Sequence, residues 1–158
     1  MSAPEEMSGG MSGGLLADEW ALRRLLQRYA QAADRNDPQQ FVSLFLENAV
    51  IVGPGFRVEG HEQIRHIPGM LAQQYRGTLH CVLNQTVTIE GDEARGESYC
   101  MAYHRYDGED GRPMTLDWAI RYQDRFARRG NEWRFAHRQL VVDWTRRTPV
   151  ELLPAPES

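Results

Sequence analysis

The sequence contains no lysine, and all 18 of its basic residues are arginine. A chain without lysine cannot form a Schiff base through a lysine side chain, and it cannot contain a P-loop, whose lysine binds nucleotide phosphates. No basic run of five or more residues occurs either, so we expect no nucleic-acid partner. No segment approaches the ~20 consecutive apolar residues of a membrane span, so we also expect no membrane partner.

Metal-binding and export signals are missing as well. Cys81 and Cys100 match no zinc-ligand spacing, and the pair His61 and His66 fits no helical ligand pair. We therefore expect no metal and no other cofactor. The first 14 residues, MSAPEEMSGGMSGG, lack the basic start and apolar centre of a secretory signal, so we predict a disordered leader on a cytoplasmic protein with reduced thiols.

What remains is typical of one soluble domain. The chain has 158 residues, of which 41% are hydrophobic and 25% charged, with a net charge of −4. We predict that residues 15–144 form this domain. Residues 145–158 carry three prolines and are expected to form a loop-like tail.

Three helices are predicted ahead of the strands. Apolar residues recur at helical spacing from Leu22 to Ala33. Asp37 and Pro38 then fit an N-cap and a first helical residue. Residues 61–75 suggest a third helix, interrupted at Pro68.

The second half of the chain predicts strands. Short strands are expected at 49–52 and 56–58, followed by four long ones at 77–89, 94–107, 114–128 and 133–144. Glycine-containing turn sequences separate the long strands, which favours an antiparallel meander. Helices ahead of such a meander indicate an α+β fold.

Four polar residues fall on faces that the patterns turn inward: Asp34, His80, His104 and Arg138. Each has a purely structural interpretation. Asp34 could cap its helix, His80 could be a hydrogen-bonded core residue, and His104 could be half exposed near a strand end. Arg138 could be the buried ion-pair partner of Asp34 or Asp124. Composition and spacing leave these alternatives open.

Taken together, several segments resemble the SnoaL-like branch of the NTF2-like superfamily. They are RRLLQRYAQAADRNDPQQFVSLFLENAVIV, TLHCVLN, GDEARGESYCMAY and YQDRFARRGNEWRFAHR. The resemblance covers about residues 15–144. It implies a cone in which three N-terminal helices pack on a strongly curved, mainly antiparallel sheet. Scytalone dehydratase, bile acid 7α-dehydratase and hexachlorocyclohexane dehydrochlorinase belong to this branch.

The resemblance also implies roles for individual residues. His80 matches the general base, Asp34 the aspartate that pairs with it, and Tyr29 a tyrosine of the first helix. Arg138 matches the arginine that follows a last-strand tryptophan, and His104 corresponds approximately to a second acid/base group. Apolar, aromatic and polar candidates for the substrate pocket are Phe41, Phe45, Asn84, Trp118, Tyr122 and Trp144.

These residues suit proton abstraction from carbon, because a neutral imidazole held by a carboxylate is a suitable base at neutral pH. The first expectation is a cofactor-independent lyase that performs dehydratase-type β-elimination on a small hydrophobic ring compound. An isomerase or polyketide-cyclase-type enzyme with the same base is the alternative. A non-catalytic ligand-binding or assembly subunit is a third. A homo-oligomer, dimer or trimer, is expected through an outer sheet face that carries Tyr99, Met101 and Tyr103.

Overall fold

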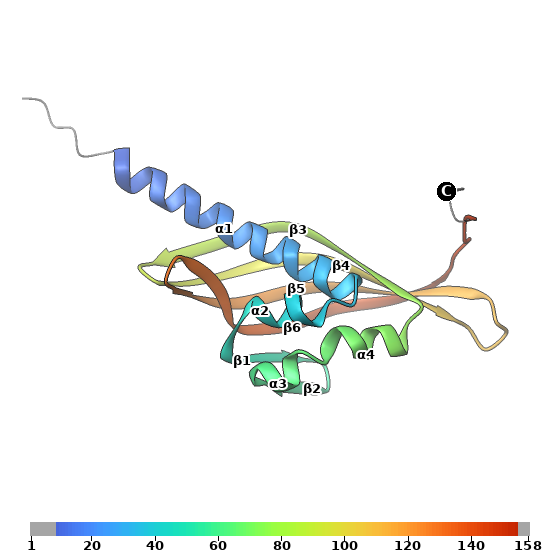
Figure 1. Cartoon of the computed structure of the whole chain (residues 1–158). Helices are drawn as coiled ribbons and strands as arrows, with labels where there is room; N and C mark the ends of the chain where they lie inside the picture. The colour runs from blue at the N-terminus through green and yellow to red at the C-terminus, as the bar shows by residue number, and fades with distance from the viewer. Residues whose placement is uncertain (1–8, 155–158) are drawn as a thin grey trace, which may run out of the picture.

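The computed structural model describes residues 9–154, within which four helices pack against a six-stranded sheet (Figure 1). The helices are α1 (Gly9–Asp34), α2 (Pro38–Ser43), α3 (Gly60–Ile64) and α4 (Ile67–Gln74). The strands are β1 (Phe45–Gly53), β2 (Phe56–Glu59), β3 (Gly77–Glu90), β4 (Glu93–Asp107), β5 (Pro113–Arg129) and β6 (Glu132–Pro149). Within these residues, no helix is long and apolar enough to cross a membrane.

The sheet has the strand order β2-β1-β6-β5-β4-β3. The pair β1–β6 is parallel, and the four other neighbouring pairs are antiparallel. The four long strands β3 to β6 therefore form the expected meander, and the helices precede it or lie between β2 and β3. This confirms the expected α+β fold with a mainly antiparallel sheet.

Three predicted boundaries differ from the structure. Helix α1 begins at Gly9, so residues 9–14 are helical rather than part of a leader, and residues 1–8 lie outside the described residues. The predicted third helix is two helices, because the chain breaks between Ile64 and Ile67 and Pro68 lies in the first turn of α4. Strand β6 continues to Pro149, well into the predicted tail.

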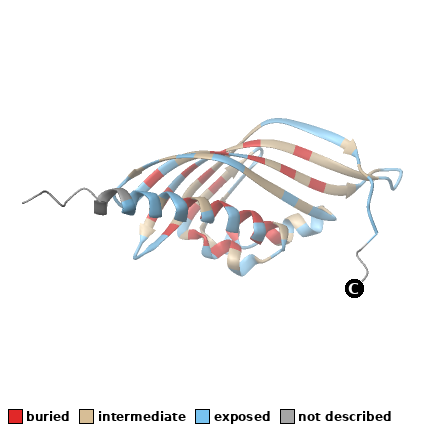
Figure 2. Ribbon diagram, turned by 90° about the horizontal axis from the view of Figure 1, so that it is seen from above, coloured by how far each residue is buried: buried red, intermediate tan, exposed pale blue. Residues whose placement is uncertain are grey.

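The main core lies between the helices and one face of the sheet, where buried positions of α1 and α2 meet those of the strands (Figure 2). On α1 these positions have helical spacing, as predicted, and include Leu22, Leu26 and Tyr29. We call the sheet face that packs against the helices the inner face and the opposite one the outer face.

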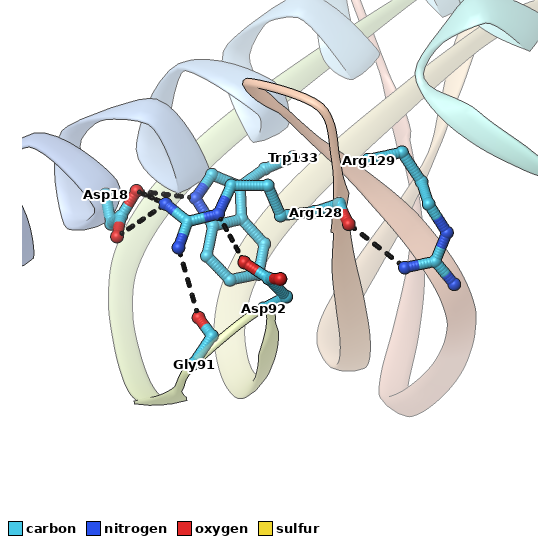
Figure 3. A network of polar contacts seen from close by, with 6 residues as sticks. All are labelled: Asp18, Gly91, Asp92, Arg128, Arg129 and Trp133. Carbon is cyan, nitrogen blue, oxygen red and sulfur yellow. Dashed lines mark hydrogen bonds and ion pairs between the residues drawn. The ribbon is translucent and has the colours of Figure 1, made fainter.

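An ion-pair network fixes α1, at Asp18, to the end of the sheet where β3 turns into β4 and β5 into β6 (Figure 3). The Asp18 carboxylate accepts hydrogen bonds from the Arg128 guanidinium at 2.9 Å and from the Trp133 indole N–H at 2.8 Å. Arg128 also donates to Asp92 at 2.8 Å, and its guanidinium lies over the Trp133 ring. From this anchor α1 runs along the sheet toward the first residues of β3.

Pairing across the strands groups the inner-face residues into rows, because residues paired in neighbouring strands have side chains on the same face. Two rows matter for the site. The His80 row consists of His80, Ala102, Trp118 and Thr145. The rim row, next to it and farther from Asp18, consists of Thr78, His104, Leu116 and Arg147.

Candidate active site

The sequence that follows α1 fixes where this helix ends. The backbone N–H of Asp37 bonds to the carbonyl of Ala32 at 2.9 Å, and that of Asn36 to the carbonyl of Ala33 at 3.3 Å. This is the Schellman arrangement, in which asparagine tolerates the left-handed φ of 51° at Asn36. The Asp37 side chain then caps α2 by accepting from the N–H of Gln40, as predicted. Asp34 is consequently the last residue of α1.

The Asp34 carboxylate makes three hydrogen bonds to β3. One oxygen accepts from the His80 ring Nδ1 at 2.6 Å and from the Thr78 hydroxyl at 2.8 Å. The other oxygen accepts from the backbone N–H of His80 at 2.9 Å. The side chain of His80 is 7% exposed and that of Asp34 17% exposed. The contact expected between these two residues is therefore present.

These bonds determine the chemistry that His80 can perform. A carboxylate can only accept, so Nδ1 carries the proton and the lone pair of a neutral ring lies on Nε2. Burial alone would raise the pKa of Asp34, but the hydrogen bonds from the His80 ring, the His80 backbone and Thr78 outweigh burial and lower it. The site thus combines an ionised carboxylate with an imidazole oriented for proton abstraction.

His104 is buried beside His80, not half exposed. Its ring centroid lies 5.8 Å from that of His80 and 5.3 Å from that of Trp118. Its Nδ1 donates to the backbone carbonyl of Leu116 at 3.0 Å, which leaves Nε2 as an acceptor. Burial lowers the pKa of His104, and the neighbouring His80 adds to this, so its neutral form is favoured.

Tyr75, which the sequence analysis did not consider, contacts His104 with ring centroids 4.7 Å apart. It is the first residue after α4. The next residue, Arg76, fixes the backbone there by donating its N–H to the carbonyl of Arg105 at 2.7 Å and its side chain to Asp107 at 2.8 Å. The position just after a helix and before the strand of the candidate base was the signal that could have identified Tyr75.

Arg138 lies on the inner face but is fully buried and paired with Asp124. Its guanidinium donates to both carboxylate oxygens of Asp124, at 2.8 and 2.7 Å. Burial alone would lower the pKa of Arg138, but the charge of Asp124 and these hydrogen bonds outweigh burial and raise it. The guanidinium also lies over the rings of Tyr122, Tyr29 and Phe135, at 3.9, 4.2 and 4.2 Å. Of the two ion-pair partners that the sequence left open, the structure selects Asp124.

Tyr29 and three of the predicted pocket residues are part of the core beneath the imidazoles. Phe41 and Phe45 are fully buried and pack on the Tyr29 ring, at centroid distances of 5.0 and 6.2 Å. Tyr122 contacts the same ring at 5.8 Å, and the Tyr29 ring lies 6.4 Å from that of His80. Burial raises the pKa of Tyr29, so its hydroxyl stays protonated at neutral pH.

Two other predicted pocket residues lie elsewhere, because β-bulges change the alternation of the strands. The pairing of β3 with β4 shifts between Val82 and Gln85, which leaves Asn84 exposed instead of on the face of His80. The pairing of β5 with β6 shifts between Ala119 and Ile120, so Trp144 pairs with Ala119 on the outer face. Trp118 is the predicted aromatic residue that the structure places beside the imidazoles.

Within residues 9–154, no three His, Cys, Asp or Glu side chains gather in a way that could hold a metal ion. The polar groups of the site whose hydrogen bonds fix their orientation belong to Asp34, Thr78, His80 and His104. The aromatic rings of Tyr75 and Trp118 lie beside them.

One family model matches most of the chain. The model of the SnoaL-like domain matches residues 15–139. A comparison with curated proteins found no match. A solved structure from Novosphingobium aromaticivorans, provisionally assigned as a scytalone dehydratase, is 25% identical with a TM-score of 0.77, and the match covers 91% of this chain and 95% of that one.

Two further solved structures have the same fold. A protein of Novosphingobium aromaticivorans, provisionally assigned as an aromatic ring hydroxylase, is 27% identical with a TM-score of 0.72, over 84% of this chain and 94% of that one. The hexachlorocyclohexane dehydrochlorinase LinA-type3 of Novosphingobium barchaimii is 16% identical with a TM-score of 0.74, and the match covers 89% of this chain and 97% of that one.

Proposed function

The chain belongs to the SnoaL-like family of the NTF2-like superfamily, and from this membership and the geometry of the site we propose that it is a cofactor-independent, small-molecule-converting enzyme. More specifically, we propose a lyase that removes water from a hydroxylated hydrophobic ring compound by β-elimination. His80 is the base and Asp34 its partner.

One observation carries this proposal: the Asp34 carboxylate bonds both the ring Nδ1 and the backbone N–H of His80. A core histidine without a role in proton transfer needs partners for its ring nitrogens, but it does not need a charged one at Nδ1. A carboxylate there stabilises the imidazolium that forms when Nε2 takes up a proton. Partial burial of the pair strengthens this effect, because the local dielectric constant is lower than that of water.

The reaction has two bond-breaking events. His80 Nε2 removes a proton from a carbon next to an activating carbonyl or ring, and the electron pair of that C–H bond forms the new double bond. The C–O bond to the hydroxyl on the adjacent carbon breaks, and the departing oxygen takes up a proton to leave as water. The imidazolium of His80 can supply this proton, which restores the neutral base.

Two other groups near the site are less suited than His80 to give a proton to the departing oxygen. The hydroxyl of Tyr29 stays protonated, but its ring belongs to the core beneath His80. His104 would need to be protonated before it could donate from Nε2, and its lowered pKa opposes this. We therefore propose that His104 accepts a hydrogen bond from a substrate hydroxyl and that Tyr29 orients the base. Arg138, which is neutralised by Asp124, supports the site from below.

The relatives support an elimination. One structure is provisionally assigned as a dehydratase and another is named a dehydrochlorinase, and both names describe the removal of a small molecule from neighbouring carbons. An isomerase or cyclase with the same base is the second candidate, because it begins with the same proton abstraction. A non-catalytic ligand-binding or assembly subunit is the third candidate, because another solved structure with this fold is described as a protein of unknown function.

The test is a panel of hydroxylated steroid, terpenoid and phenylpropanoid compounds, analysed by mass spectrometry after incubation with the full chain. The proposal predicts a product lighter by one water. The matched control is the His80→Ala variant, which should give none. A product of unchanged mass with a moved double bond would establish the isomerase instead. If no compound is converted but one binds, the non-catalytic candidate gains support.

A further inference from the structure

The charged side chains on the inner side of the sheet and at the end of α1 differ in whether they have an oppositely charged or hydrogen-bonding partner. Asp34 is bonded to His80, and Arg138 is bonded to Asp124. The side chain of Arg147, in the rim row, makes neither a hydrogen bond nor an ion pair with any residue in the described part of the chain, and it is exposed. The site therefore has one arginine whose charge is free to bind an external anion.

The register of the sheet places this arginine in line with the candidate acid/base groups. Arg147 on β6 pairs with Leu116 on β5, which pairs with His104 on β4. The His80 row is the next one along the strands. Neighbouring strands lie about 4.8 Å apart, so the three steps from β6 to β3 separate these backbones by about 14 Å along the sheet. A long arginine side chain and a ring compound together can span this distance.

Tyr75 contacts His104, which lies on β4, between the strands of Arg147 and His80. Its ring packs on that of His104. Its hydroxyl has no hydrogen bond within residues 9–154. Burial raises the pKa of Tyr75 and the positive charge of Arg147 lowers it, which is consistent with the two side chains lying near each other at the rim. Trp118, whose ring centroid lies 5.3 Å from that of His104, supplies a second aromatic surface.

We propose that Arg147 binds a carboxylate on the substrate, so that the lyase acts on a ring compound carrying an acidic group. The guanidinium binds the carboxylate in a bidentate manner, through two parallel N–H···O hydrogen bonds, and the Tyr75 hydroxyl is an additional donor. The ring of the substrate then lies against Tyr75 and Trp118, with its reacting carbon toward His80 Nε2. This inference rests on the proposed function for the identity of the site, but its central claim concerns binding.

The experiment compares two probes of equal size, 2-naphthoate and 2-naphthamide, by calorimetric titration of the full chain. The acid should bind roughly five- to tenfold more tightly than the neutral amide, because a charge-assisted bond at a partly exposed site contributes modestly. The Arg147→Gln variant should lose this preference by weakening only the acid. Equal binding of the two probes to the unmodified protein, or no binding of either, would overturn the proposal.

The neighbouring arginine provides the matched control. Arg146 is on the same strand but on the outer face, where its guanidinium donates to Asp117 at 2.9 and 3.1 Å. The Arg146→Gln variant should keep the preference for the acid, and a loss equal to that of Arg147→Gln would refute a specific role of Arg147.

The two proposals can fail separately. The His80→Ala variant should still prefer naphthoate. If the preference exists but no dehydration is found, the anion site stands without the lyase. If dehydration is found for neutral compounds and the preference does not exist, the lyase stands without the anion site.

Discussion

Asp34 holds His80 at two points: one carboxylate oxygen accepts the ring Nδ1–H, and the other accepts the backbone N–H. The ring and the strand that carries it are therefore positioned by the same side chain. This double contact makes the effect of replacing either residue predictable.

Replacing His80 by alanine should reduce kcat by about 10²–10⁴-fold, the usual contribution of a general base. Replacing Asp34 by asparagine should also cause a large loss, because the charge that stabilises the imidazolium is gone. Since the two residues act as a unit, the double variant should be scarcely slower than His80→Ala alone. Steady-state kinetics on the converted compound measures this, and additive losses would show that the residues work separately. Thr78→Val, which removes one of the three hydrogen bonds to Asp34 and leaves both bonds to His80, is the mild control.

His104 should make stability depend on pH below neutrality. Burial lowers its pKa in the folded state, so the unfolded chain binds this proton more readily. The stabilisation by neutral His104 is complete above the unfolded pKa, about 6.5, and it is lost as the pH falls from there toward the folded pKa. Urea unfolding between pH 8 and pH 5 should show this decline, and His104→Gln should flatten it. A slope unchanged in the variant would assign the decline to other groups.

The buried pair of Arg138 and Asp124 should matter for stability. Arg138→Met leaves the buried Asp124 without its partner, and such a loss typically costs about 3–5 kcal/mol in the free energy of unfolding. The double variant Arg138→Met with Asp124→Leu should be more stable than Arg138→Met alone, since no buried charge remains. Chemical denaturation of the three proteins measures the difference. If the double variant is no more stable than Arg138→Met, the unpaired charge of Asp124 is not the cause of the loss in stability.

The Asp18 network should anchor α1. In the Asp18→Ala variant, Arg128 and the Trp133 indole both lose their acceptor, and we expect the melting temperature to fall by a few degrees. Asp18→Asn keeps an acceptor oxygen and should fall less. Amide hydrogen exchange locates the change, because protection should decrease first in the part of α1 near Asp18. Uniform loss of protection across the chain would instead show that the network supports the whole fold.

The outer face should mediate homo-oligomerisation. An apolar patch there consists of Leu79, Cys81, Tyr99, Met101, Tyr103 and Trp144, of which Leu79, Tyr99 and Trp144 are 57, 42 and 50% exposed. Patches of this kind on a sheet are rarely left in contact with water. We propose that a second copy of the chain covers it.

Sedimentation at micromolar concentration should therefore show a dimer or trimer, and Trp144→Glu should shift it toward the monomer. Met70→Glu, at an exposed position of α4, is the control. A monomeric unmodified protein would contradict this proposal.

The pairing of Asp34 with His80 was predicted from the resemblance to the SnoaL-like family, and regular periodicity had already placed both residues on inward faces. Asp34 extends a row of apolar residues spaced by four on α1, and His80 alternates regularly near the start of β3. Asn84 and Trp144 were misplaced because each follows a bulge, and an extra residue in a strand reverses the faces of all residues beyond it. No local feature of the sequence indicated these two bulges.

Arg147 was missed for a different reason. The last strand was predicted to end at residue 144, because polar residues and prolines follow it in the sequence. Residues 145–149 form strand through pairing with β5, which a local pattern does not reveal. The partner of Arg138 likewise depends on strand register, which brings Asp124 directly opposite Arg138 and leaves Asp34 to His80.

The hydrogen bond between Asp34 and the His80 backbone has one more consequence. Strand β3 is the last strand of the sheet, so within residues 9–154 its outward N–H and C=O groups have no neighbouring strand. Such an open edge can pair with a strand of another molecule and start aggregation. By occupying the N–H of His80, the end of α1 blocks this edge at the residue that we propose as the base. The carboxylate that orients the His80 ring thus also opposes the addition of a foreign strand there.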